Sequence, residues 1–268
     1  MKISVVIPTK NEEKWLHITL ESLREATQDS EIIIVDNDCG YESKLIAEKF
    51  NCSIRQGTTP AISRNIGANI ASGELIIFID ADVVISKKHI DMVKEIFNKD
   101  SNIGVVHFKI DPMSDSWFIN TCYNIMNQYF RILHSIGFSQ GIGNYIAVRK
   151  EVYRKVGGFD EDILVGEDAD FFRRVNKITD VSFIYTEPIY ASARRFYLEN
   201  PYVFATKCLL WALLRTLGLR VSIFEYKWGK YASILAEKDR EWVRRKEIQQ
   251  GLRSGTLPHG SAADVGGG

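Results

Sequence analysis

The chain has 268 residues, of which 45% are hydrophobic and 25% are charged, a composition that is ordinary for a soluble globular protein. Its formal net charge of +0 excludes a global field that would steer it toward nucleic acid. The four cysteines form no Cys-x-x-Cys motif, so we expect free thiols in a reducing compartment. The apolar run before Pro8 is too short for a signal peptide, and no run approaches the roughly 20 residues that span a bilayer. We therefore expect a cytoplasmic protein.

Alternating strand and helix patterns occupy the first hundred residues. Short continuous apolar runs indicate buried strands, and apolar residues three or four positions apart indicate helices. Asn11 is placed to cap the first helix, and Pro60 suits the first turn of the third. Strands that alternate with helices form parallel sheets with right-handed crossovers, so we expect an α/β fold. The expected strands are 3–7, 31–35, 52–55 and 75–79, and the expected helices follow residue 11 and cover 42–50 and 60–73.

The second half of the chain has a less regular pattern. The expected strands are 105–110, 141–148 and 181–185, and the expected helices are 117–133, 149–156 and 167–177. Residues 201–248 have a helical pattern of different composition, so we expect a helical appendage at 200–250. The segment 251–268 is rich in Gly, Ser and Ala and is expected to be disordered, with a remnant of an expression vector as an alternative origin.

Asp80 and Asp82 follow the apolar run 74–79, with one residue between them. Two carboxylates at the mouth of a buried strand suit Mg²⁺ or Mn²⁺, because such cations take oxygen ligands and often need only one or two protein carboxylates, with phosphate oxygens supplying the rest. Ligands of open α/β sheets bind just outside the carboxyl ends of the strands, where this pair falls. A solvated acidic turn is the alternative for an isolated pair.

Three further polar clusters lie near the expected strands. Residues 8–12 follow the first strand, residues 36–38 follow the second, and residues 63–67 belong to the helix before the central strand. A turn, a helix cap or a strand end would explain each cluster singly. Parallel strands, however, gather these ends on one edge of the sheet, where acidic groups can hydrogen-bond a base and a ribose while a metal carries the phosphates.

Six segments give the chain a resemblance to a known family. They are SVVIPTKNE (4–12), IIIVD (32–36), SRNIG (63–67), IFIDAD (77–82), GGFDE (157–161) and GEDADFF (166–172). In this order they resemble the family 2 glycosyltransferases. The resemblance implies a GT-A fold, with a mostly parallel sheet flanked by helices, over residues 1–199. A nucleotide-sugar-binding half would cover about 1–110 and an acceptor half about 111–199.

The resemblance also implies roles for individual residues. Asp82, together with Asp80, would hold the metal, and Asp168 would act as the general base. Members of the family invert the configuration of the transferred sugar. The nucleotide-binding residues would include Pro8, Thr9, Glu12, Asp36, Arg64 and Asp80, and the acceptor side would include Gly143, Asn144 and Glu167.

Two of these positions have competing interpretations. Glu167 and Asp168 would also suit an ordinary acidic helix start, placed there by the helix dipole, and the resemblance favours catalysis. Arg194 and Arg195 stand where many processive relatives carry Gln-x-x-Arg-Trp, and the absence of that motif argues against processive synthesis. Their guanidinium groups suit phosphate oxygens and are expected to bind the diphosphate, with a basic surface run as the alternative.

We therefore expect a metal-dependent, inverting glycosyltransferase. It would move a sugar from a nucleoside-diphosphate sugar to a hydroxyl of a glycan, lipid-linked or polysaccharide precursor. One alternative is a nucleotidyltransferase that makes the sugar nucleotide. Such an enzyme is expected to have a glycine-rich phosphate loop after the first strand, whereas residues 8–12 here are PTKNE. The other alternative is a non-catalytic nucleotide-sugar-binding module, against which Asp168 argues.

The apolar cluster near the C-terminal end leaves two interpretations open. Its residues are Tyr202, Val203, Leu209, Leu210, Trp211, Leu213 and Leu214, with Lys207, Arg215 and Arg220 around them. The helix that carries them would pack on the core or on a second subunit in a homo-oligomer. Alternatively it would lie on the inner face of the membrane, with the basic residues facing anionic lipids.

Overall fold

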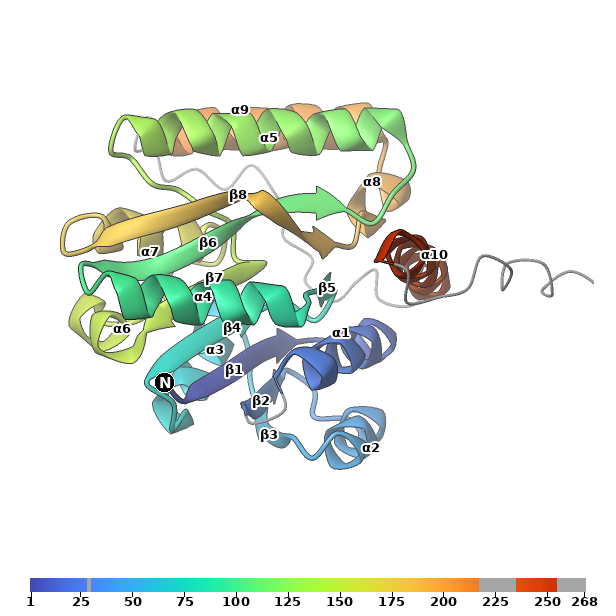
Figure 1. Ribbon diagram of the computed structural model, residues 1–268, viewed down its shortest axis with the longest axis horizontal. Helices are drawn as coiled ribbons and strands as arrows, with labels where there is room; N and C mark the ends of the chain where they lie inside the picture. The colour runs from blue at the N-terminus through green and yellow to red at the C-terminus, as the bar shows by residue number, and fades with distance from the viewer. Residues whose placement is uncertain (28–29, 217–234, 255–268) are drawn as a thin grey trace, which may run out of the picture.

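Eight strands form one sheet in the computed structural model, which describes residues 1–27, 30–216 and 235–254 (Figure 1). Their order across the sheet in these residues is β3-β2-β1-β4-β7-β6-β8-β5. The first four run parallel to one another, and β1 and β4 are buried along their whole lengths, as their continuous apolar sequences predict. They are β1 (Ile3–Thr9), β2 (Glu31–Asp36), β3 (Ser53–Gln56) and β4 (Leu75–Ile79).

The helices between these strands are α1 (Glu13–Ala26), α2 (Tyr41–Lys49) and α3 (Pro60–Ile70). Pro60 occupies the first turn of α3 as expected, and the Thr59 side chain accepts a hydrogen bond from the Ile62 N–H at 3.3 Å. Gly67 lets α3 lie close to β1, because a Cβ at this position would be 2.2 Å from Val6 Cγ1. The glycine thereby fixes the position of the helix that carries Arg64.

The second half of the sheet is mixed. β6 (Ile103–Pro112) pairs in parallel with β8 (Asp180–Ala191), whereas β5 (Val83–Val84) is antiparallel to β8. β7 (Tyr145–Arg149) lies between β4 and β6 and is antiparallel to both, so it joins the parallel half to the mixed half. The helices here are α4 (Lys87–Lys99), α5 (Trp117–Ser135), α6 (Lys150–Val156) and α7 (Glu167–Val175).

Some local expectations differ from the structure. The expected cap of the first helix is wrong: Glu12 is the N-cap residue of α1, and Asn11 has a left-handed backbone with φ of 51° that places it outside the helix. The strand expected from residue 141 begins only at Tyr145, because residues 143–144 form a turn. β8 continues past Pro188, and β5 and α4 occupy a stretch where no element was expected.

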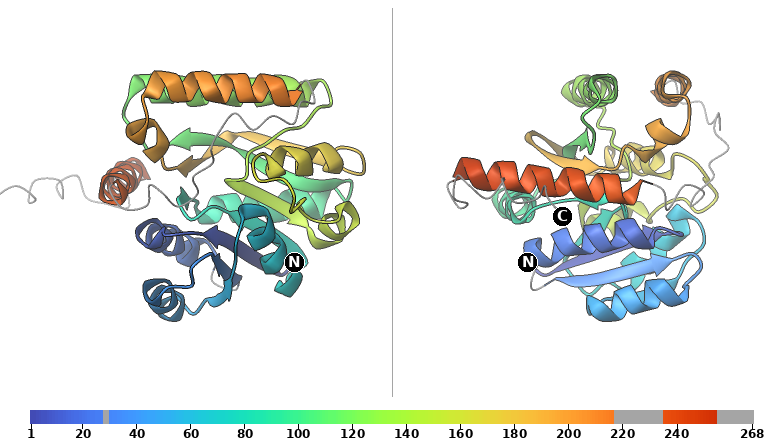
Figure 2. Two further views of the ribbon diagram at one scale, coloured as in Figure 1. Left: turned by 180° about the vertical axis from the view of Figure 1, so that it is seen from behind. Right: turned by 90° about the vertical axis from the view of Figure 1, so that its right-hand side faces the viewer.

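Helices cover both faces of the sheet, and each face has its own core (Figure 2). Val5 belongs to the core under α1 and α4, whereas the next residue, Val6, belongs to the core under α3, α6 and α7. This alternation follows from strand geometry, in which successive side chains point to opposite faces. Each Å² of apolar surface buried on either face stabilises the fold by about 25 cal/mol. This burial fixes the strands, and with them the loops at the carboxyl ends of β1, β2 and β4.

In the described residues after β8 the helices are α8 (Arg194–Leu198), α9 (Pro201–Thr216) and α10 (Ala236–Ser254). α9 lies beside α5, at the opposite end of the molecule from α2 (Figures 1 and 2). α10 packs on α1, where Ala236 joins Trp15 and Ile18 in a small apolar cluster. α10 ends four residues beyond the boundary expected at 250, whereas Arg220 and residues 255–268 lie outside the described residues.

Candidate functional site

The loop after β4 brings Asp80 and Asp82 to the edge of the sheet where β1 and β2 also end. The Thr19 hydroxyl of α1 donates to the Ala81 carbonyl at 2.7 Å, and the Ser192 N–H donates to the Asp82 carbonyl at 3.0 Å. The loop is thus held from both sides. The Asp82 side chain is 10% exposed and that of Asp80 is 32% exposed, so the two carboxylates meet different environments.

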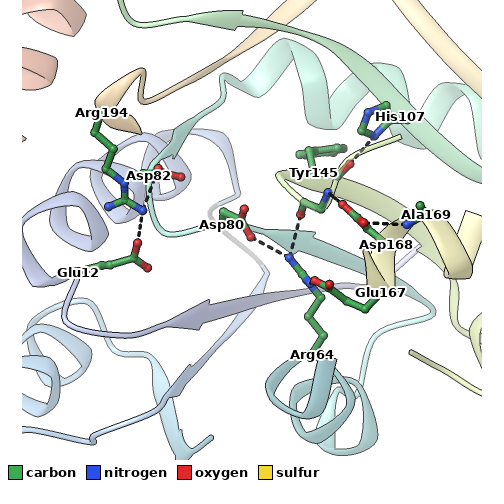
Figure 3. A network of polar contacts seen from close by, with 11 residues as sticks. Glu12, Arg64, Asp80, Asp82, His107, Tyr145, Glu167, Asp168, Ala169 and Arg194 are labelled. Atoms are coloured by element: carbon green, nitrogen blue, oxygen red, sulfur yellow. Dashed lines mark hydrogen bonds and ion pairs between the residues drawn. The ribbon is translucent and has the colours of Figure 1, made fainter. Parts of the chain in front are cut away.

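Glu12, Asp82 and Arg194 form a buried group that we call the Arg194 cluster (Figure 3). Arg194 Nη2 lies 3.1 Å from Asp82 Oδ2 and also forms an ion pair with Glu12. The guanidinium lies over the Trp15 ring, 4.5 Å from its centroid. Burial raises the pKa of Glu12 to about 7 and also raises the pKa of Asp82, while the positive charge of Arg194 opposes both shifts.

Arg64, Asp80 and Glu167 form a second group, the Arg64 cluster (Figure 3). Arg64 Nη1 donates to Glu167 Oε1 at 2.7 Å, and Nη2 donates to Asp80 Oδ1 at 3.0 Å and to the Gly143 carbonyl at 3.4 Å. A Cβ at Gly143 would be 2.5 Å from Arg64 Nη2, so only glycine leaves room for this arrangement. The cluster therefore links β4, α7 and the turn before β7.

Asp168 lies beside the Arg64 cluster, on the first turn of α7. One carboxylate oxygen accepts a hydrogen bond from the Gly143 N–H and the other from the Ala169 N–H, both at 2.7 Å. Burial, followed by the nearby charge of Glu167, raises the pKa of Asp168 to about 6, while Arg64 and the two hydrogen bonds oppose that rise. A carboxylate with this pKa is ionised at neutral pH and can take up a proton.

The other predicted site residues lie along the same edge of the sheet. Pro8 and Thr9 are buried at the end of β1, and the Asn144 carbonyl accepts a hydrogen bond from the Asp80 N–H at 3.1 Å. Asp36, at the end of β2, is buried, and its Oδ1 has no hydrogen-bond partner in the part of the chain that the structure describes. Arg194 and Arg195 differ, because Arg194 is buried in its cluster whereas Arg195 is exposed.

Asp239 of α10 is a contributor that the sequence interpretation missed. It is buried, it accepts a hydrogen bond from Trp15 Nε1 at 2.8 Å, and it also accepts one from the Ser192 hydroxyl. The Ser192 oxygen in turn accepts a hydrogen bond from the Arg194 N–H at 3.2 Å. The sequence around Asp239 is a charged run that is typical of any exposed helix, so only its tertiary contacts identify it.

Asn65 belongs to the SRNIG segment, and the structure explains its place there. Its Nδ2 donates to the Phe159 carbonyl at 2.9 Å, while its Oδ1 accepts hydrogen bonds from the Phe159 N–H and the Tyr153 hydroxyl. The side chain therefore ties α3 to the GGFDE segment. Two of the sequence motifs are joined by this single side chain, next to Arg64.

Comparisons with known proteins agree on one family. The family model described as Glycosyl transferase family 2 matches residues 4–157. An uncharacterized glycosyltransferase of Haemophilus influenzae is 28% identical over 182 residues, which cover 65% of this chain and 61% of that protein. The match thus spans less than two thirds of that protein's length.

Solved structures show the same fold. TarS residues 1–349 from S. aureus, solved with UDP-GlcNAc, align with a TM-score of 0.59 at 21% identity, covering 72% of this chain and 59% of that chain. Glucosyl-3-phosphoglycerate synthase from Mycobacterium tuberculosis, solved with Mn²⁺, UDP and glucosyl-3-phosphoglycerate, aligns with a TM-score of 0.57 at 15% identity, covering 82% and 81%. Both are similar to this chain in fold.

Proposed function

From the premise that the chain belongs to glycosyltransferase family 2, has a GT-A fold and is a glycosyltransferase, we propose that it transfers a sugar from a nucleoside diphosphate to a hydroxyl with inversion. One observation carries the proposal. Gly143 bridges the loop of Asp80 and Asp82 to Asp168, because its carbonyl accepts from Arg64 while its N–H donates to Asp168. A donor held at the loop of Asp80 and Asp82 would thus face Asp168 as a proton acceptor.

The nucleoside would bind at the ends of β1 and β2. Asp36 supports this assignment, because its buried Oδ1 lacks a partner among the described residues and a buried unpaired acceptor is costly. An N–H donor of a nucleobase would satisfy it. Thr9 is buried beside it through the pairing of β1 with β2. The two solved relatives named above carry uridine nucleotides, so UDP is the first nucleotide to test with this chain.

Asp82 and Asp80 would hold the metal. Carboxylate oxygens fit a hard cation such as Mg²⁺ or Mn²⁺. Within the described residues no group of three or more His, Cys, Asp or Glu side chains could hold a metal ion, so the remaining ligands would be oxygens of the donor diphosphate and water. A bound cation would act as a Lewis acid on the diphosphate. Arg194 already neutralises Asp82 and would contribute positive charge beside the same phosphates.

Asp168 would act as the general base. The acceptor oxygen forms a bond to the anomeric carbon, the bond from that carbon to the diphosphate oxygen breaks, and the electron pair leaves with the diphosphate. The hydroxyl proton goes to Asp168, whose pKa of about 6 suits this transfer near neutral pH. Glu167 accepts from Arg64 at 2.7 Å and would position that arginine rather than take the proton. Attack from the face opposite the leaving group inverts the anomeric configuration.

Calorimetry and product analysis test the proposal together. UDP, GDP and CDP are titrated into the protein with MnCl₂ or with EDTA, and we expect one nucleotide to bind more tightly with Mn²⁺. The anomeric proton coupling of the transferred sugar, measured by NMR with the matching donor, should show inversion. Retention of configuration, or nucleotide binding that is equal with Mn²⁺ and with EDTA, would contradict the corresponding part of the proposal.

A further inference from the structure

Exposed apolar side chains are concentrated on two helices outside the site described above. Fifteen large hydrophobic residues are exposed in the described part of the chain, and nine of them lie on α5, on α9 or in the turn after α5. We call these nine residues the α5–α9 face. They are Trp117, Ile125, Ile132, Ile136, Phe138, Tyr202, Val203, Leu209 and Leu210. A concentration of this kind marks an interaction surface, whereas single exposed apolar residues need no explanation.

The two helices form one continuous layer. They lie side by side at one end of the molecule, with their axes in the same direction in the view (Figures 1 and 2). Phe118 of α5 and Tyr202 of α9 contact each other with ring centroids 4.7 Å apart, and the Tyr129 hydroxyl donates to the Ala212 carbonyl at 3.1 Å. The inner residues Ile119 and Phe204 pack in a shared apolar cluster with α8. The outward residues are therefore additional to those that hold the helices on the domain.

The charges of this layer are of one sign. Neither α5 nor α9 contains an Asp or Glu, although the chain has 34 of them in 268 residues. Arg131 on α5 is exposed, and its guanidinium lies 5.4 Å from the centroid of the Tyr185 ring on β8. Lys207 on α9 is partly exposed and pairs with Glu199 in the turn before the helix. The other exposed positions of the two helices in the described residues are uncharged, for example Thr121, Gln128 and Thr206. No carboxylate of either helix would repel an anionic surface.

We propose that the α5–α9 face docks on the surface of a lipid bilayer. The apolar side chains would enter the boundary between headgroups and acyl chains, as in interfacial helices. Trp117 and Tyr202 are the side chains that favour the headgroup level, and the positive charge of Arg131 would attract anionic lipids to this layer. The helices would lie in the membrane plane, since no helix in the described residues is both long and apolar enough to cross a bilayer.

A second copy of the chain is the competing occupant, and the charges argue against it. In a two-fold dimer through this face, the basic residues of α5 and α9 from both copies would meet no acidic side chain of either helix. Anionic headgroups supply that missing charge. The face is also separate from the Arg194 and Arg64 clusters, so membrane docking can be tested without a donor or an acceptor.

Vesicle flotation tests the proposal. The probes are phosphatidylcholine vesicles and vesicles of phosphatidylcholine with one third phosphatidylglycerol. Two variants change the face, Ile125→Glu/Ile132→Glu on α5 and Leu209→Glu/Leu210→Glu on α9. The matched control is Leu45→Glu/Ile178→Glu, which places the same charges at exposed apolar positions elsewhere. We expect the parent and the control to float with the anionic vesicles, and each face variant to bind at least about tenfold more weakly.

Two further measurements keep the outcome interpretable. Circular dichroism and light scattering verify that each variant is folded and of unchanged mass. Quenching by brominated lipid is measured on the parent and on Trp117→Phe, so a tryptophan that enters the bilayer is detected even if a Glu variant unfolds. A parent that stays out of the vesicle fraction would overturn the proposal. So would a control that loses binding as much as the face variants, or a parent dimer that the face variants dissociate without any vesicle binding by the parent.

Discussion

The Arg194 cluster and the Arg64 cluster contain the same chemical groups in two different environments. Each is a buried guanidinium held by two carboxylates. Arg64 comes from α3, whose position is fixed by close packing on β1, and it joins Asp80, at the end of β4, to Glu167 of α7. Arg194 comes from the short helix α8 and is supported by Asp239 of α10 through Ser192.

The difference lies in how each cluster balances its charge. Asp80 is one third exposed, so water solvates part of the negative charge around Arg64. Glu12 and Asp82 are both buried, and the pKa of Glu12 rises to about 7 because the cluster cannot hold two full carboxylates away from water. A cluster with surplus buried negative charge suits a cation, whereas the Arg64 cluster lies beside Asp168, the proposed base. Substitutions should therefore separate an effect on rate from an effect on donor binding.

Substitution of the proposed base should have the largest effect. Asp168→Asn keeps the size of the side chain and removes the proton acceptor, so we expect kcat to fall by about 10²–10⁴. The affinity for the nucleoside diphosphate should change little, since Asp168 contacts neither Asp80 nor Asp82 through a hydrogen bond. Steady-state kinetics and calorimetry on the same preparation measure the two quantities. Loss of both in parallel would show that the two clusters are not separable.

The pH dependence of kcat/KM in the parent protein is a second test of Asp168 as the proposed base. The base must be ionised to accept a proton, and its pKa is raised to about 6. The value of kcat/KM should therefore rise about tenfold per pH unit below 6 and level off above it. The same shift has the opposite sign for stability: the folded state holds this proton better than the unfolded state, so this contribution to the free energy of unfolding is present at low pH and lost as pH rises through 6. A flat rate profile between pH 5 and 7 would exclude Asp168 as the base.

Removal of Arg194 should make stability depend on pH. In Arg194→Met, Glu12 and Asp82 lose their buried partner, which costs about 3–5 kcal/mol when both are ionised. Their folded-state pKa values rise further, so the loss should be greatest at pH 8 and smaller at pH 5, where protonation neutralises them. Urea unfolding at the two pH values measures this difference. Arg154→Met is the control, because Arg154 is exposed on α6 and should change the free energy of unfolding little at either pH.

The parallel half and the mixed half of the sheet differ in how much of the structure the sequence could predict. In the first half, continuous apolar strands and local motifs predict both the elements and the edge where Thr9, Asp36 and Asp80 meet, because parallel strands leave few alternatives. In the second half, the pairing of β7 between β4 and β6 depends on contacts distant in sequence. Asp239 could not be identified for the same reason, since it lies 224 residues from Trp15. The assigned roles of these residues remain predictions.

Removal of the Asp82 carboxylate should weaken the Mn²⁺-dependent binding of the nucleoside diphosphate. In Asp82→Ala, the increase in nucleoside-diphosphate affinity that Mn²⁺ gives should fall by at least about tenfold, because the cation loses its proposed ligand. Affinity for the bare nucleoside should stay the same, since Asp36 and Thr9 are untouched. Calorimetry with and without Mn²⁺ measures both quantities, and Asp91→Ala, an exposed carboxylate on α4, is the control. An unchanged Mn²⁺ effect would remove Asp82 from the metal site.

Substitution of Asp239 should have the smallest effect, because Asp239 would act only by positioning Arg194 through Ser192. Asp239→Asn weakens the hydrogen bonds from Trp15 and Ser192, each of which contributes about 1 kcal/mol, so the KM for the donor should rise a few-fold while kcat changes less. The matched control is Asp115→Asn, which weakens the contacts of Trp242 and Arg245 that hold α10 elsewhere on the domain. If both variants raise the KM equally, α10 acts only by docking. A rise confined to Asp239→Asn would show that its carboxylate positions Arg194 through Ser192, and that the C-terminal helix is part of the donor site.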